Sequence, residues 1–131
     1  MVFDTSAVLA ILLGEEESPR LVRAVASDEK RLMGAATLVE ASAVMMARKG
    51  SGGDVALDAL LRRLDVEIVP LTETAATLAR LAYGRYGKGV STPGLLNFGD
   101  CLSYGTAMAL REPLLFKGED FSRTDVTAVE Y

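Results

Sequence analysis

The sequence predicts a single α/β domain over residues 1–131, built on a mainly parallel, twisted sheet of four to five strands with helices on both faces. Three observations predict this class. Short apolar runs alternate with segments of helical periodicity along the whole chain. Such alternation requires crossover connections, which produce a parallel sheet covered on both sides. The length of 131 residues suits one domain with its own core, and no internal repeat or low-complexity tract divides it.

The expected strands are short apolar runs that end at a polar residue or at a residue that breaks regular structure. Asp4 ends the first strand, Gly34 follows the second, and Pro70 closes the third. The five expected strands are residues 1–3, 31–33, 66–69, 114–116 and 126–129.

The expected helices begin or end at capping and breaking signals. Ser18 is a suitable N-cap, with Pro19 at the first helical position. The glycine-rich residues 50–53 separate the third helix from the fourth, and Thr72 caps the fifth. A flexible glycine-rich segment is expected at 84–93. The six expected helices are residues 6–13, 19–29, 36–49, 54–65, 73–83 and 97–110.

The third helix, residues 36–49, is apolar or small at nearly every position around its axis. A helix that is apolar on all sides is normally buried. We therefore expect residues 36–49 to be mostly covered by neighbouring elements, and the acidic residue Glu40 within it to be an exception that needs an explanation.

Acidic residues stand at positions where apolar residues are expected. Asp4 closes the first strand, Glu40 lies inside the third helix, and Asp100 opens the last helix. A fourth acid, Asp120, follows the strand at 114–116 by one short loop. The carboxyl ends of parallel strands and the starts of the following helices meet at one edge of a sheet, where ligands bind. We therefore expect these four acids to converge.

Each acid also has an ordinary structural explanation. Asp4 is a suitable N-cap for the first helix. Asp100 with Asn97 forms the pattern of a capping box. Glu40 fits a narrow exposed strip of its helix, and Asp120 fits a turn. Taken singly these explanations are adequate, but four such residues at compatible positions favour a shared site.

A cluster of carboxylates requires a cation. Two carboxylates about 4 Å apart repel by roughly 4 kcal/mol at an effective dielectric constant near 20. The chain has no histidine, which excludes Ser-His-Asp and Cys-His catalysis and histidine-ligated zinc. Oxygen ligands select Mg²⁺ or Mn²⁺, which can activate water and clamp a phosphodiester. The net charge of −4 argues against nucleic-acid binding unless such a cation bridges the two anions.

The cysteine count and the hydropathy pattern predict a cytoplasmic protein. Cys101 is the only cysteine, so an internal disulfide is excluded and a reducing compartment is expected. We interpret it as a buried small residue without a redox role. No apolar run approaches the ~20 residues of a membrane span, and no basic segment precedes the run at 7–13, so neither a membrane anchor nor a signal peptide is expected.

Four segments resemble a known family. They are VFDTSA at 2–7, LVEAS at 38–42, LNFGDCLSYG at 96–105 and LLFKGEDFSRTD at 114–125. Together they resemble the PIN-domain family, and within it the VapC-type ribonuclease toxins of prokaryotic type II toxin–antitoxin systems. The resemblance spans the whole chain, with the motifs in the same order and at similar spacing.

The resemblance implies an activity and a set of site residues. It implies an endoribonuclease that depends on Mg²⁺, with Mn²⁺ as a substitute, whose metal ligands are Asp4 and Asp100. Glu40 and Asp120 complete the catalytic set, with Glu119 or Asp125 as alternatives to Asp120. It also implies a supporting hydroxyl from Thr5 or Ser6, an RNA substrate, a cognate antitoxin and a homodimer. The candidate RNA contacts are Arg48, Lys49, Arg85, Lys88 and Lys117.

Two other classes of function stay open at this point. A phosphoryl hydrolase of the haloacid dehalogenase type would carry a second aspartate two residues after Asp4, where Ser6 stands. A receiver domain would carry an acidic pair, which is absent, and a later lysine, for which Lys117 is available. A non-catalytic α/β binding module, whose acids only cap helices, would show no rise in melting temperature with Mg²⁺ or Mn²⁺.

Overall fold

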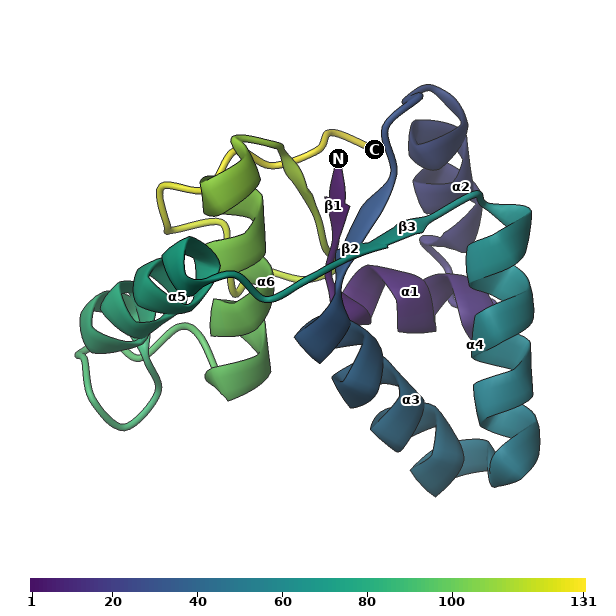
Figure 1. Cartoon of the computed structure of the whole chain (residues 1–131), viewed down its shortest axis with the longest axis horizontal. Helices are drawn as coiled ribbons and strands as arrows, with labels where there is room; N and C mark the ends of the chain where they lie inside the picture. The colour runs from purple at the N-terminus through teal and green to yellow at the C-terminus, as the bar shows by residue number, and fades with distance from the viewer.

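A parallel sheet of four strands lies at the centre of the computed structural model, which describes residues 1–131 (Figure 1). The strands are β1 (Val2–Phe3), β2 (Leu32–Gly34), β3 (Glu67–Val69) and β4 (Leu114–Leu115), in the order β3-β2-β1-β4. The helices are α1 (Thr5–Leu12), α2 (Ser18–Ala26), α3 (Ala35–Lys49), α4 (Ser51–Arg63), α5 (Glu73–Tyr86) and α6 (Phe98–Leu110). The α/β class predicted from the sequence is confirmed.

The alternation of side chains along the strands divides the core into two parts. Phe3, Met33 and other buried residues of one face pack against α1 to α4. Val2 and Leu114 belong to the opposite face, which packs against α5 and α6. Figure 1 shows the same division, with α5 and α6 on one side of the sheet and α1 to α4 on the other. Helices therefore cover both faces, as a parallel sheet requires.

The fifth expected strand, residues 126–129, is present only as a single bridge. Ala128 pairs with Leu114 in parallel orientation, and the Val129 N–H donates to the Leu114 carbonyl over 2.9 Å. The segment thus lies along the free edge of β4 without forming a strand. It satisfies part of the backbone that an edge strand leaves unpaired.

The glycine-rich residues 50–53 do not separate the third and fourth helices over the whole range that the sequence predicts. Gly50 has a φ of +65° and makes the turn between the two helices, but α4 already begins at Ser51. Gly53 lies inside α4, where an added Cβ would stand 2.3 Å from the Met45 carbonyl oxygen. The glycine is therefore present because α3 and α4 approach closely, and the breaker interpretation was wrong for residues 51–53.

Two other local predictions also need correction. Helix α2 has Glu17 as its N-cap, without a side-chain cap bond, so Ser18 is the first helical residue. Helix α5 continues through Gly84 to Tyr86, into the segment expected to be flexible. The Thr72 cap is confirmed by a hydrogen bond from the Ala75 N–H to the Thr72 hydroxyl. None of the helices combines the length and the apolar character that crossing a bilayer would require.

Helix α3 is less buried than its sequence predicts. Only Thr37, Ala41 and Met45 are buried along it. Val39 is 68% exposed and Met46 is 47% exposed, so an apolar stripe of α3 faces away from the core. Helix α3 therefore has apolar side chains on two faces, one packed in the core and one exposed.

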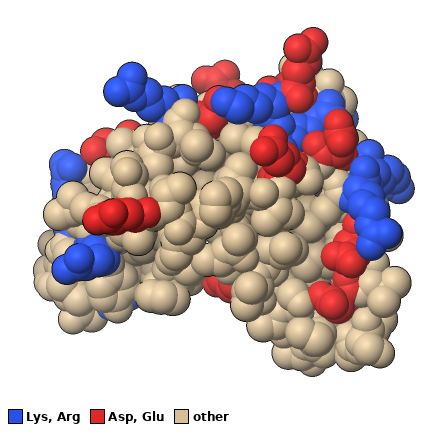
Figure 2. All heavy atoms as spheres, viewed as in Figure 1, with Lys and Arg blue, Asp and Glu red and all other residues tan.

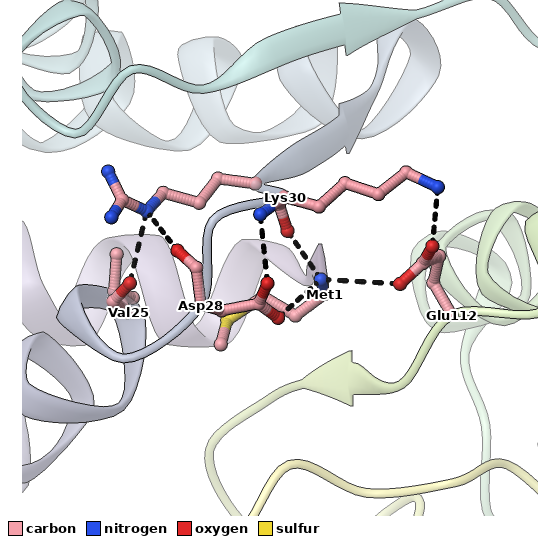
Figure 3. Close-up of polar contacts among 6 residues, drawn as sticks. Met1, Val25, Asp28, Lys30 and Glu112 are labelled. Carbon is pink, nitrogen blue, oxygen red and sulfur yellow. Dashed lines mark hydrogen bonds and ion pairs between the residues drawn. The ribbon is translucent and has the colours of Figure 1, made fainter.

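The α-ammonium group of Met1 anchors β1 at the amino edge of the sheet (Figure 3). This buried group donates to the Asp28 carboxylate over 2.8 Å and to the Lys30 carbonyl over 2.5 Å, and it lies 3.5 Å from Glu112. The hydrogen bond from the ammonium lowers the pKa of Asp28. These contacts tie the amino end of β1 to the loops before β2 and β4, and so they help to fix the strand that ends at Asp4.

Candidate active site

Asp4 lies at the carboxyl end of β1 and is 2% exposed. Its Oδ2 accepts hydrogen bonds from the Ser6 N–H over 2.9 Å and from the Ser6 hydroxyl over 2.5 Å. The N-cap interpretation is therefore confirmed for this oxygen. The other oxygen, Oδ1, is buried and has no hydrogen-bond partner. A buried carboxylate oxygen without a partner is costly, and capping does not account for it.

The Ser6 hydroxyl links Asp4 to the loop after β4. It donates to Asp4 and accepts from the Lys117 N–H over 2.9 Å. Lys117 lies two residues after the end of β4, so residues that follow two neighbouring strands, β1 and β4, hold Asp4 in one orientation.

Glu40 points from the second turn of α3 toward the same edge of the sheet. Its Oε2 accepts a hydrogen bond from the Thr5 hydroxyl over 2.7 Å. Burial raises the pKa of Glu40, and the negative charge of Asp4 raises it further, while the bond from Thr5 opposes both. Of the two hydroxyls proposed to support the site, Ser6 thus serves Asp4 and Thr5 serves Glu40.

Gly99 allows Glu40 to reach the start of α6. A Cβ added at Gly99 would stand 2.0 Å from Glu40 Oε1 and 2.5 Å from Oε2. Only a glycine leaves room for this carboxylate beside the first turn of α6. The sequence carries a weak signal for this contact, since Gly99 is a poor helix former placed inside a helix start.

Asp100 occupies the first turn of α6 and forms the predicted capping box. The Asn97 N–H donates to Asp100 Oδ2 over 2.7 Å, and the Asp100 N–H donates to Asn97 Oδ1 over 2.8 Å. Burial raises the pKa of Asp100 to about 6, and the charges of Asp4 and Asp120 act in the same direction. Asp4 and Asp120 therefore both act electrostatically on Asp100, in addition to the effect of its burial.

Asp120 lies in the exposed loop after β4, where its Oδ2 pairs with the Lys88 ammonium over 3.2 Å. Asp125 is engaged elsewhere, since it accepts hydrogen bonds from the Tyr86 and Tyr104 hydroxyls over 3.0 and 2.8 Å. Glu119 makes no side-chain hydrogen bond or ion pair in the structure. Among the three candidates for the fourth acid, these contacts favour Asp120.

The basic residues proposed as RNA contacts differ in their surroundings. Lys117 is held by Glu15 and Glu17 over 2.5 and 3.1 Å, and Arg85 pairs with Asp125 over 3.3 Å. Arg48 and Lys49 are exposed at the end of α3. At 1.5 Å per residue, the eight residues from Glu40 to Arg48 place Arg48 about 12 Å along the helix from the acids. Lys88 is the only one of the five that pairs with a site acid.

The donor set suits a hard divalent cation, although the site is not a finished metal centre. No group of three or more acidic, cysteine or histidine side chains is already arranged as a metal site. The buried Asp4 Oδ1 nevertheless has no hydrogen-bond partner in the protein and is therefore available to a cation. A cation bound between Asp4 and Asp100 would give Asp4 Oδ1 the partner it lacks. It would also reduce the repulsion between the two carboxylates, which adds to the effect of burial on the pKa of Asp100.

Comparison with known proteins agrees with this geometry. The PIN-domain family model matches residues 1–126. The chain belongs to the PIN-domain family. "Ribonuclease VapC" of Mycolicibacterium smegmatis is 48% identical to it over 129 residues, covering 98% of this chain and 99% of that one. "VapC ribonuclease Mb0640" of Mycobacterium bovis is 46% identical over 129 residues, covering 98% of each.

Solved structures show the same PIN-domain fold. VapC20 of Mycobacterium tuberculosis, described as a sarcin-ricin loop cleaving toxin, superposes with a TM-score of 0.76 at 19% identity over the whole of both chains. A toxin–antitoxin complex from Klebsiella pneumoniae superposes with a TM-score of 0.73 at 19% identity, covering 99% of this chain and 97% of that one. The predicted PIN-like architecture is therefore confirmed.

Proposed function

We propose that this PIN-domain protein is a metal-dependent endoribonuclease that acts as the toxin of a toxin–antitoxin pair. The single observation that carries the proposal is the pair Asp4 and Asp100, with a buried unpartnered oxygen on Asp4 and a raised pKa on Asp100. The curated relatives, which are named as VapC ribonucleases and match nearly the full length, support the activity.

In this proposal Asp4 and Asp100 hold Mg²⁺, with Mn²⁺ as a substitute. The ion supplies positive charge beside the scissile phosphodiester and lowers the pKa of a bound water. It also removes the objection that a chain of net charge −4 repels RNA. Ser6 keeps Asp4 oriented through the bonds to its Oδ2, and the unpartnered Oδ1 would be free to bind the cation.

Glu40 is the proposed proton acceptor for the attacking water. Its raised pKa brings the carboxylate nearer to the working pH, where a general base is more effective. The Thr5 hydroxyl fixes its direction, and Gly99 keeps the space that it occupies free. Asp120 is proposed as the fourth acid, at the exposed rim of the site.

We further propose that the protein forms a homodimer through the apolar surface around the site. Val39 on α3, Leu81 on α5 and Phe98 at the start of α6 are 68, 64 and 73% exposed. Figure 2 shows a largely uncharged surface on both lobes of the molecule in this view, with acidic atoms at the notch between them. Exposed apolar side chains mark an interface where they form one contiguous patch. Light scattering should give twice the mass of one chain; a single-chain mass would contradict the dimer.

Expression in a bacterial host tests the toxin function. We expect growth to stop within a few generations of induction, because RNA cleavage removes transcripts needed for growth, and we expect co-expression of the cognate antitoxin to restore it. Sequencing of RNA 5′ ends after brief induction should show new ends at a limited set of positions. Undisturbed growth with soluble, folded protein and no new RNA ends would contradict the proposal.

A further inference from the structure

Lys88 is the one basic side chain that pairs with an acid of the candidate site. Its ammonium lies 3.2 Å from Asp120 Oδ2, and the other lysine and arginine pairs of the chain involve acids outside the site.

The backbone of Lys88 is fixed, while the end of its side chain is free. The Lys88 N–H donates to the Leu96 carbonyl over 2.8 Å, and the Tyr83 hydroxyl donates to the Lys88 carbonyl over 3.3 Å. An added Cβ on Gly94 would lie 2.6 Å from Lys88 Cα, so the loop packs tightly against this residue. The side chain is 49% exposed. The aliphatic part of the side chain is therefore the part that is free to move. The backbone partner of Lys88, Leu96, directly precedes the α6 N-cap, Asn97.

We propose that Lys88 is a built-in counter-ion of the carboxylate site, which neutralises Asp120 in the metal-free protein and releases it when a divalent cation binds. This inference rests on the proposed metal dependence. It adds that the Lys88 ammonium competes with the divalent cation for the acids of the site. A divalent cation bound at the acids would repel the Lys88 ammonium and attract the Asp120 carboxylate, so it competes with the ion pair. An ion pair with both partners about half exposed is weak, so a doubly charged ion held by several carboxylates displaces it.

A cation-binding measurement on the purified, metal-free protein tests this competition without relying on cleavage. We expect Lys88→Met to bind Mn²⁺ about three- to fivefold more tightly than the wild type in isothermal titration calorimetry, the range that an exposed ion pair allows. Lys88→Arg should keep the wild-type affinity because it keeps the charge. Arg85→Met is the matched control, because it removes the same charge from a residue that pairs with Asp125, outside the acid set.

The contact itself is tested by combining Lys88→Met with Asp120→Asn. Asp120→Asn alone removes the pair, so adding Lys88→Met to it should change the Mn²⁺ affinity little. An equal gain in both backgrounds would show a long-range charge effect and overturn the counter-ion, as would no gain from Lys88→Met in the wild type. A wild-type protein that binds no Mn²⁺ at all would instead contradict the proposed metal dependence, and with it the counter-ion.

Discussion

Replacing Asp4 by asparagine is expected to reduce Mg²⁺-dependent RNA cleavage by about 10²- to 10³-fold, the order of loss seen when one electrostatic partner of a transition state is removed. Asparagine caps helices as well as aspartate does, so the bond from the Ser6 N–H should persist and α1 should stay intact. The substitution also removes the charge associated with the buried, unpartnered Oδ1. The metal-free variant should therefore melt no lower than the wild type.

The Asp4→Asn result separates a capping role from a metal-ligand role. Cleavage of a labelled RNA is measured with Mg²⁺, with a chelator, and after Mg²⁺ is restored, beside a thermal melt of each protein. Asp58→Asn is the matched control, since Asp58 is an exposed acid of α4 that pairs only with Arg62. Full cleavage by a folded Asp4→Asn protein would contradict the assignment of Asp4 as a ligand.

Replacing Gly99 by alanine is the second substitution with a large expected effect. The new Cβ would stand 2.0 Å from Glu40 Oε1, so the Glu40 carboxylate must move away from the start of α6 and from Thr5. The atom displaced is the end of a flexible side chain, so the fold should survive. Loss of a positioned general base costs about 10²- to 10⁴-fold, and we expect a decrease in cleavage rate within this range.

The Gly99→Ala effect should depend on Glu40. Cleavage by the double variant Gly99→Ala/Glu40→Gln should be no slower than cleavage by Glu40→Gln alone, because both changes remove the same group. Gly84→Ala is the matched control, since an added Cβ there meets nothing within 4 Å. Additive losses in the double variant would show that Gly99 acts through something other than Glu40.

The fold follows from the sequence wherever local pattern decides the structure. The four strands, the Thr72 cap and the capping box of Asn97 and Asp100 all lie close to their expected positions. The errors occur where a contact distant in sequence overrides the local signal. The sequence predicts Gly53 to interrupt the helix, but this residue lies inside α4, where the α3 backbone passes beside it. The sequence predicts Val39 to be buried, yet its side chain is exposed because no element of this chain covers that stripe of α3.

The candidate site is predictable in its acids and less so in their environment. Asp4, Glu40 and Asp100 stand out in the sequence because acidic residues are unusual beside buried strands and in apolar helices. The ammonium on Asp120 comes from Lys88, 32 residues earlier, and no spacing rule links the two. Lys117 is a second example of surroundings that the sequence does not show, since its ammonium pairs with Glu15 and Glu17, and an RNA phosphate would have to compete with these two acids.

The central claim is that Asp4 and Asp100 bind one divalent cation at the carboxyl edge of the sheet. Anomalous diffraction from crystals soaked in Mn²⁺ tests it most directly, because the signal locates the metal independently of activity. We predict a peak bonded to Asp4 Oδ1 and to an oxygen of Asp100, at the 2.0–2.3 Å or so typical of a hard cation and oxygen ligands. No peak between these two acids at saturating Mn²⁺, or a peak only elsewhere on the molecule, would contradict the claim.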